Sequence, residues 1–298
     1  MNFNNPNVKL TPRPQGAGYH LHINQSALEV LGLIFEFKLA TGWHISRFLT
    51  QKDYVQYVYL KLRRMWQAGY LESFKISSES ANGIPVYYMI SRSGLKVLAE
   101  HGLYSESQLS NYPKAKTLFS SHMFKYESQV VELASLEANN KTKDLDISFK
   151  GELSSQGQDY KSDKTIEALT PDYTVYYTFA GQQHLVYTEL ERTAKSKMTQ
   201  TRKIERYINF LDYEQRQAVT LRIIFQTPGM EQSFWLNALT NLPGLHSLRV
   251  LTTNTSQLES HNKFLQAIYA SEQTVKLGRF GGRLTVDTSE RIKLFEFL

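Results

Sequence analysis

Apolar residues recur at helical spacing near the start of the chain. Between residues 26 and 39 they fall three and four positions apart, on one face of a predicted helix: Leu28, Leu31, Ile34, Phe35 and Leu39. Ser26 is a suitable N-cap, and Thr41-Gly42 is predicted to end the helix. A short helix over 43–49 and a longer one over 51–67 follow, so this part of the chain is predicted to be helical.

The pattern then changes to that of a hairpin. Residues 70–74 and 85–90 read as strands around a polar turn that ends in Asn82-Gly83, a strong hairpin signal. A helix is predicted over 91–101. Three helices, a hairpin and a further helix are the order of a winged helix-turn-helix, which we place over residues 20–110. Residues 1–19, rich in proline and glycine, are predicted to be a flexible arm.

Strands and helices alternate in the second half of the chain. Residues 111–121 are predicted to be a linker, residues 122–275 an α/β domain with one mixed sheet flanked by helices, and residues 276–298 an irregular tail. A hairpin is expected across Ala180-Gly181. The other predicted elements are helices over 122–139, 197–213, 231–240 and 257–269, and strands over 145–149, 172–179, 184–190, 219–226 and 248–252. The predicted fold class is α/β, or α+β over the whole chain.

Composition narrows the possible functions. The chain has 298 residues and no cysteine, which excludes disulfides, thiolate zinc sites and a cysteine nucleophile. A formal charge of +6 suits a polyanionic partner. The first residues lack the apolar core of a signal peptide, and the longest apolar stretch, 27–39, is short and interrupted by charges. We therefore expect a cytoplasmic protein with no membrane insertion.

Three carboxylates are predicted to meet at the end of one hairpin. Asp172 opens a strand, and Glu189 and Glu191 lie near the end of its partner, where residues i and i+2 point to the same face. Clustered carboxylates repel one another unless a cation neutralises them, and oxygen ligands suit Mg²⁺ or Mn²⁺. Such an ion can activate water and stabilise charge on a phosphoryl group. The sequence thus predicts a metal site at Asp172, Glu189 and Glu191.

A basic run follows this acidic segment. On a helix its cations would flank the metal site and face phosphates: Arg192, Lys195, Lys197, Arg202, Lys203 and Arg206. In this interpretation Glu191 completes the shell of the cation or positions water, and Lys195 stabilises the developing charge. An acidic metal site beside a basic helix is suited to phosphodiester cleavage.

The same residues resemble known nucleases. Pro171-Asp172 and Glu189-Leu190-Glu191 resemble the two parts of the PD-(D/E)xK motif, with glutamate where lysine is usual. The run LVYTELERTAKSKMTQTRKIERY resembles the replication-relaxation family, which includes MobC-type relaxases of mobilisable plasmids and combines a winged helix with a nuclease-like core. The likeness implies nicking of double-stranded DNA that has a nicked or single-stranded region at a plasmid origin. It also implies an accessory relaxosome protein and a coupling protein as partners, and a histidine at the position of His122.

The helix over 51–67 is the predicted DNA-reading element. We expect Gln51, Lys52, Gln56, Tyr57 and Lys61 to face the major groove, and Arg63 and Arg64 to contact phosphates. His122 and Glu132 are candidates for residues that hydrogen-bond to the metal ligands and so orient them.

A simpler interpretation stays open for each motif. Glu-x-Glu on an edge strand is often only a solvated face, the basic aromatic helix can be a solvated helix, and Tyr207 has the spacing of a packing residue. His20-Leu21-His22 is interpreted as incidental. The rival function is a non-catalytic replication or transcription regulator with a nuclease-like fold, which the glutamate in place of lysine favours.

Overall fold

A computed structural model describes residues 8–13, 21–50, 55–76, 86–119, 121–155, 169–214, 219–242, 245, 248–258, 263–266, 269–280 and 283–294. The fold is α/β, and the chain divides into two compact units. Unit 1 comprises residues 1–139 and 151–157, and unit 2 comprises residues 140–150 and 158–298. Both the predicted linker and the helix that follows it therefore belong to the first unit, so the boundary predicted from the sequence is wrong.

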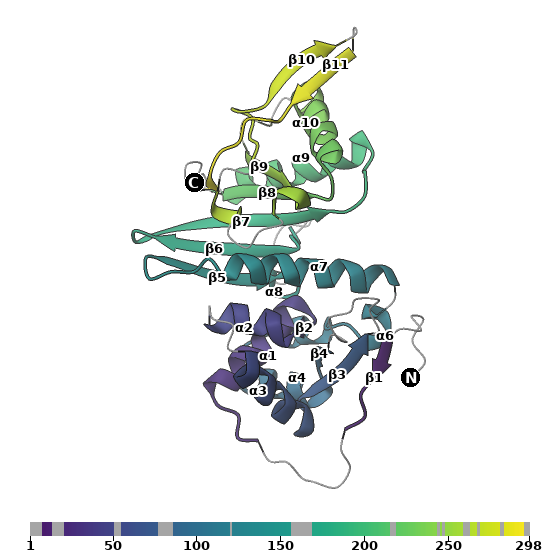
Figure 1. Ribbon diagram of the computed structural model, residues 1–298, viewed down its shortest axis with the longest axis vertical. Helices are drawn as coiled ribbons and strands as arrows, with labels where there is room; N and C mark the ends of the chain where they lie inside the picture. The colour runs from purple at the N-terminus through teal and green to yellow at the C-terminus, as the bar shows by residue number, and fades with distance from the viewer. Residues whose placement is uncertain are drawn as a thin grey trace. The chain divides into compact units, whose positions relative to one another are not determined.

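Unit 1 contains the predicted order of elements (Figure 1). It runs α1 (Gln25–Phe37), β2 (Ala40–Thr41), α2 (Gly42–Thr50), α3 (Val55–Gln67), β3 (Leu71–Ile76), β4 (Val86–Ile90) and α4 (Arg92–Glu100). β3 and β4 pair antiparallel, as the hairpin signal predicts, although the Asn82-Gly83 turn lies outside the described residues. Ser91 caps helix α4, because its side chain accepts a hydrogen bond from the Gly94 amide.

Part of the predicted flexible arm is a strand. β1 (Val8–Leu10) pairs antiparallel with β3 and gives a sheet of order β1-β3-β4-β2. Val8 is buried, and its backbone satisfies groups on the edge of β3 that would otherwise need water. Proline and glycine content indicated a loop, but pairing with an edge strand overrides that local preference.

The first helix begins and ends differently from the prediction. Asn24 caps it by accepting a hydrogen bond of 3.0 Å from the Ala27 amide, whereas Ser26 lies inside the first turn. The helix ends at Phe37 because Lys38 takes a φ of 66°. The buried ammonium of Lys38 lies 2.5 Å from carboxylate oxygens of Glu127 and Glu152, which stabilises this unusual position.

The predicted linker is a packed part of unit 1. Short helices α5 (Glu106–Ser110), α6 (Ala115–Leu118) and α8 (Glu152–Ser155) accompany the long helix α7 (Ser121–Ala138). The Tyr112 hydroxyl accepts a hydrogen bond of 2.9 Å from the Ile90 amide and donates one of 2.6 Å to the Lys38 carbonyl. The Phe119 ring packs on Phe74 at a centroid distance of 4.4 Å. These contacts explain why the segment is ordered despite its polar composition.

Unit 2 is built on a five-stranded sheet of order β5-β6-β7-β8-β9. Its strands are β5 (Leu145–Gly151), β6 (Tyr173–Phe179), β7 (Gln182–Glu191), β8 (Val219–Phe225) and β9 (Arg249–Asn254), and its long helices are α9 (Lys197–Glu214) and α10 (Pro228–Asn241). β6 and β7 are antiparallel, and β7, β8 and β9 are parallel. Positive φ at Ala180 and Gly181 suits the tight turn predicted between β6 and β7.

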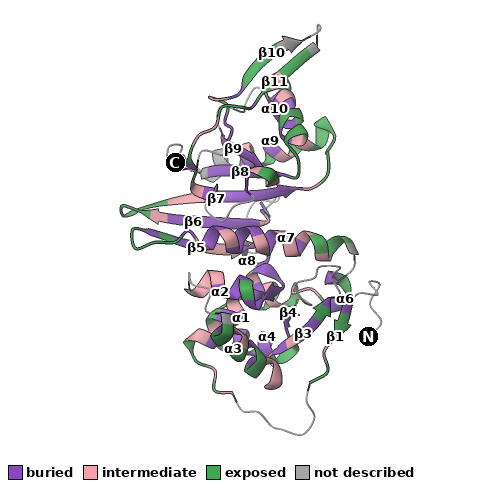
Figure 2. Ribbon diagram, in the orientation of Figure 1, coloured by how far each residue is buried: buried purple, intermediate pink, exposed green. Residues whose placement is uncertain are grey.

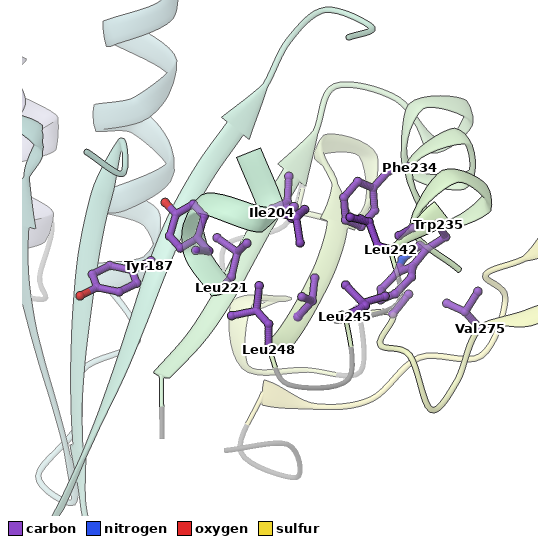
Figure 3. Close-up of a cluster of buried hydrophobic side chains, with 14 of the residues drawn as sticks. Tyr187, Ile204, Leu221, Phe234, Trp235, Leu242, Leu245, Leu248 and Val275 are labelled. Carbon is purple, nitrogen blue, oxygen red and sulfur yellow. The ribbon is translucent and has the colours of Figure 1, made fainter. Parts of the chain in front are cut away.

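The core of unit 2 lies between the sheet and its two long helices. Figure 3 shows one buried cluster of side chains, with Tyr187 of β7 and Leu221 of β8 at one end, Ile204 of α9 in the middle, and Phe234 and Trp235 of α10 at the other end. The other face of the sheet buries Arg222, whose guanidinium donates a hydrogen bond of 2.8 Å to the Thr188 hydroxyl. Alternation along the strands therefore directs Tyr187, Glu189 and Glu191 toward α9.

Two predictions near the C-terminus are wrong. Within the described part of 257–269 there is no α-helix; 3-10 turns occur at Thr255–Gln257 and Lys263–Leu265, and Ala270 pairs with Thr252. The predicted irregular tail contains an antiparallel hairpin of β10 (Lys276–Phe280) and β11 (Arg283–Asp287), which is mostly exposed (Figure 2). Among the described residues, no helix combines the length and the hydropathy needed to cross a membrane.

Candidate functional site

Two buried carboxylates mark the end of β7. Glu189 and Glu191 are 7% and 8% exposed, and the intervening Leu190 points to the opposite face. A buried carboxylate is costly unless it is paired with a cation or hydrogen-bonded. The helix that covers this face, α9, supplies both kinds of partner.

Lys203 of α9 bridges the two glutamates. Its Nζ lies 2.8 Å from Glu189 Oε2 and 2.6 Å from Glu191 Oε1. Burial lowers the pKa of Lys203, but attraction to Glu189 and Glu191 outweighs burial, so the pKa is raised above 10.5. The lysine therefore stays charged. The sequence placed Lys203 among the phosphate contacts; this is corrected, because its ammonium binds the carboxylates that were expected to bind metal.

Tyr207 completes this network one helical turn after Lys203. Its hydroxyl donates a hydrogen bond of 2.6 Å to Glu189 Oε1, and burial together with the charge of Glu189 raises the pKa of Tyr207 well above 10. Its ring also packs beside Tyr187, at a centroid distance of 5.9 Å, which agrees with the packing interpretation. The missed signal was the i, i+4 spacing of Lys203 and Tyr207, which puts both side chains on one face of a helix.

Asp172 reaches the same strand from its hairpin partner. It immediately precedes β6, whose first residue, Tyr173, pairs with Thr188. Asp172 Oδ2 accepts a hydrogen bond of 2.6 Å from the amide of Leu190, the residue between the two glutamates. The prediction that hairpin pairing brings Asp172 to the Glu189-Glu191 segment is confirmed.

The other cations of the basic run surround this cluster more loosely. Lys195 Nζ lies 3.9 Å from Glu191 Oε2, and its side chain is 44% exposed. Arg192 is half-buried, and the remaining three are exposed: Lys197, Arg202 and Arg206. These side chains lie at the surface, whereas Lys203 is held between the two glutamates.

A cavity of about 350 Å³ lies beside the Glu191–Lys203 pair. Lys195, Arg202 and Arg206 also line it, so most of the charge around it is positive. Ile223 and Phe225 of β8 and Met230 and Phe234 of α10 line another part of it, together with polar side chains that include Thr199, Gln200 and Ser233. The acidic cluster thus adjoins a concave basic surface.

The metal prediction fits this arrangement only in part. Among the described residues, no group of three or more histidine, aspartate or glutamate side chains is arranged to hold a metal ion. A metal ion held by all three carboxylates would have to lie between Glu189 and Glu191. The ammonium of Lys203 occupies that position. Asp172 and Glu189 still offer hard oxygen donors, and Mg²⁺ is commonly held by one or two carboxylates, with water and substrate phosphate completing its shell. Each of these two carboxylates already accepts a hydrogen bond or binds an ammonium within the protein, so a cation would have to share these contacts.

Helix α3 in unit 1 presents most of its predicted DNA contacts to solvent. Gln56, Tyr57, Arg63 and Arg64 are exposed, while Val58, Leu62 and Met65 form the buried side. Gln51 and Lys52 lie outside the described residues.

Lys61 is an exception on this helix. It is only partly exposed, its Nζ donates a hydrogen bond to the Ser26 hydroxyl, and burial lowers its pKa. This corrects its assignment to the major-groove contacts, because the side chain is held against α1.

The two residues expected to orient the metal ligands lie on α7 of unit 1, whereas the predicted ligands belong to unit 2. His122 is exposed on α7. Glu132, also in unit 1, binds His44 Nε2 and Arg47 Nη1, each at 2.8 Å. Burial raises the pKa of Glu132, but the hydrogen bonds and charges of His44 and Arg47 outweigh it and lower the pKa to about 2. These contacts join α7 to α2, which corrects the predicted role.

Comparison of the chain with known protein families, with curated proteins and with solved structures finds no match. The interpretation of the site therefore depends on its own geometry.

Proposed function

We propose that this protein binds DNA and nicks one strand with Mg²⁺ or Mn²⁺, as a relaxase acting in the cytoplasm at a plasmid transfer or replication origin. The observation that supports the cleavage proposal is the gathering of Asp172, Glu189, Glu191 and Lys203 at one end of the β6–β7 hairpin. The basic cavity beside them suits a phosphodiester backbone.

Each residue of the cluster has a distinct role in this proposal. Asp172 and Glu189 would hold the divalent cation, which supplies a Lewis acid and an activated water when bound. Lys203 provides the positive charge that the usual motif places two residues after the glutamate, and Glu191 holds Lys203 in position. Tyr207 orients Glu189 through its hydrogen bond. Lys195, at the rim, is positioned to stabilise charge on a phosphate.

Helix α3 is the proposed DNA-docking element. Its exposed side carries Gln56 and Tyr57, which suit base edges, and Arg63 and Arg64, which suit phosphates. In this proposal unit 1 recognises the DNA site and unit 2 cleaves the strand.

The test uses supercoiled plasmid that carries the cognate origin. With Mg²⁺ the wild-type protein should yield open circles, and Asp172→Asn and Glu189→Gln should abolish them while retaining DNA binding in a gel shift. Asp146→Asn is a matched control, because it removes the same charge from the exposed surface of β5 and should nick normally. Loss of activity in Asp146→Asn, or full activity in Asp172→Asn, would contradict the assigned site.

A second function is favoured by one observation. Lys203 already neutralises part of the Glu189–Glu191 charge, so this cluster has a stabilising partner within the protein. A non-catalytic plasmid replication or transcription regulator would use the same cluster only to hold α9 on the sheet. Wild-type protein that binds the origin but never nicks it, with any divalent metal and at any pH, would establish this alternative.

A further inference from the structure

Helix α2 begins with a capping box in which a histidine takes the place of the usual acceptor. The Thr41 hydroxyl accepts a hydrogen bond of 3.3 Å from the His44 amide, and His44 Nδ1 accepts one of 3.2 Å from the Thr41 amide. In an ordinary capping box the second acceptor, three residues after the cap, is glutamate or glutamine. Here it is an imidazole nitrogen, which accepts this bond only while it carries no proton.

The other ring nitrogen of His44 faces a carboxylate. Nε2 lies 2.8 Å from Glu132 Oε2 of α7, and the second oxygen of Glu132 binds Arg47 Nη1 at 2.8 Å. Because Nδ1 accepts a hydrogen bond, the proton of the neutral ring has to be on Nε2, from which it is donated to Glu132. Neutral His44 therefore joins the N-terminus of α2 to α7.

A further proton on the ring would affect these two contacts in opposite ways. It would enter at Nδ1, which would then be a donor facing the amide donor of Thr41, so that hydrogen bond would be lost. The contact with Glu132 would become an ion pair and gain strength. Glu132 thus makes a charged ring tolerable at a buried position, and the cost falls on the Thr41 amide.

The titratable groups that face His44 keep their charge near neutral pH. The pKa of Glu132 is lowered to about 2 by His44 and Arg47, so Glu132 is ionised, and arginine stays charged in proteins. The ring of Tyr87 of β4 lies 6.3 Å from that of His44, between centroids, and burial together with the charge of Glu132 raises the pKa of Tyr87 above 10. None of these three groups changes its charge between about pH 5 and pH 8, the range in which imidazoles do.

We propose that His44 is a proton-dependent switch at the start of α2. The neutral ring holds the Thr41 amide and Glu132 together, whereas the charged ring keeps Glu132 and releases the amide. In acid the first turn of α2 therefore loses one of the two hydrogen bonds of its capping box. This inference does not rest on the proposed function, because all four residues of the switch, Thr41, His44, Arg47 and Glu132, belong to unit 1 and need no ligand.

The first measurement determines which ring nitrogen carries the proton. Nitrogen NMR shifts of the full chain should show neutral His44 with its proton on Nε2, and the His44→Gln variant identifies the signals. His101 is the internal comparison, since its Nδ1 lies 2.9 Å from the Val97 carbonyl oxygen and its neutral ring should carry the proton on Nδ1. A neutral His44 with the proton on Nδ1 would overturn the proposal.

The second measurement follows hydrogen exchange of the Thr41 amide from about pH 5 to about pH 8. After correction for the intrinsic pH dependence of exchange, protection in the wild type should fall about ten-fold or more as His44 takes up its proton, because the amide loses its partner. His44→Gln should show constant protection, since glutamine accepts the same bond and does not titrate. His101→Gln is the matched control: it removes an exposed histidine of unit 1 and should behave as the wild type.

A third variant keeps the test independent of whether His44→Gln folds. Glu132→Gln removes the attraction for the charged ring, so the fall in Thr41 protection should move to lower pH. Protection that stays constant in the wild type over this range, or that falls equally in the wild type and His44→Gln, would overturn the proposal.

Discussion

Replacing Lys203 with methionine tests the electrostatics of the site most directly. Methionine keeps the apolar part of the side chain and removes the charge, leaving Glu189 and Glu191 on one face without their shared cation. The side chains of both glutamates are 10% exposed and that of Lys203 is 30% exposed. Breaking a fully buried ion pair costs ~3–5 kcal/mol. Because Lys203 keeps some contact with water, we expect Lys203→Met to lower the free energy of unfolding by roughly 2–3 kcal/mol.

The measurement is native-state hydrogen exchange of the amides in β7 and α9. It reports on unit 2 by itself, which a global unfolding curve of a chain with two compact units does not. Lys203→Arg should retain most of the stability. Lys195→Met is the matched control: its ammonium lies 3.9 Å from Glu191 and its side chain is 44% exposed, so removal should cost about 0.5 kcal/mol or less.

The pH dependence of this stability has a definite sign. The folded-state pKa of Lys203 is raised above 10.5, so its contribution is complete below pH 10.5 and is lost only as the pH rises through the folded-state value. The difference between wild type and Lys203→Met should therefore stay constant from pH 7 to about pH 10. Added Mg²⁺ should return part of the stability lost in Lys203→Met if a cation can bind the two carboxylates that have lost Lys203. A Lys203→Met protein within about 0.5 kcal/mol of wild type would refute the bridge as a stabilising element.

Three further predictions follow from named contacts. Tyr207→Phe removes the hydrogen bond to Glu189 and should cost ~1.5–3 kcal/mol in the same exchange measurement, and unchanged protection would contradict the contact. The pKa of Glu132 is lowered to about 2, so its contribution to the free energy of unfolding is present above pH 4.5 and is lost as the pH falls through about 2. The urea midpoint of unit 1 should therefore fall less on acidification in Glu132→Gln than in the wild type. An equal fall in both proteins would contradict the ion pair. Arg63→Gln and Arg64→Gln should each lower the slope of log affinity for duplex DNA against log salt by about 1, and an unchanged slope would remove that arginine from the phosphate contacts.

Local patterns were sufficient where one element could be recognised by itself. The three helices and hairpin of unit 1 were predictable because apolar spacing and turn residues act over a few positions. The β6–β7 hairpin was predictable for the same reason, and its register brought Asp172 to the right strand. The shared face of Glu189 and Glu191 followed from strand alternation alone.

Long-range pairing determined the elements that the sequence analysis missed. β1 forms because β3 offers an edge, and the segment around Tyr112 is ordered because its hydroxyl joins Ile90 to Lys38. The helix predicted over 257–269 is replaced at its end by a strand contact, because Ala270, the next residue, pairs with Thr252 of β9. Such contacts join positions distant in sequence, and periodicity within a short window carries no information about them.

By itself, the sequence determined that two acidic side chains share one face of a strand, that an aspartate reaches this strand and that a cationic helix follows. Only the tertiary structure decided which cation lies between the acids. Lys203 was one of six cations in the basic run, and its selection depends on how α9 is rotated against β7. The packing of Ile204, Tyr207 and Phe210 into the core sets that rotation, and it holds Lys203 over the glutamates while Arg202 and Arg206 are left exposed.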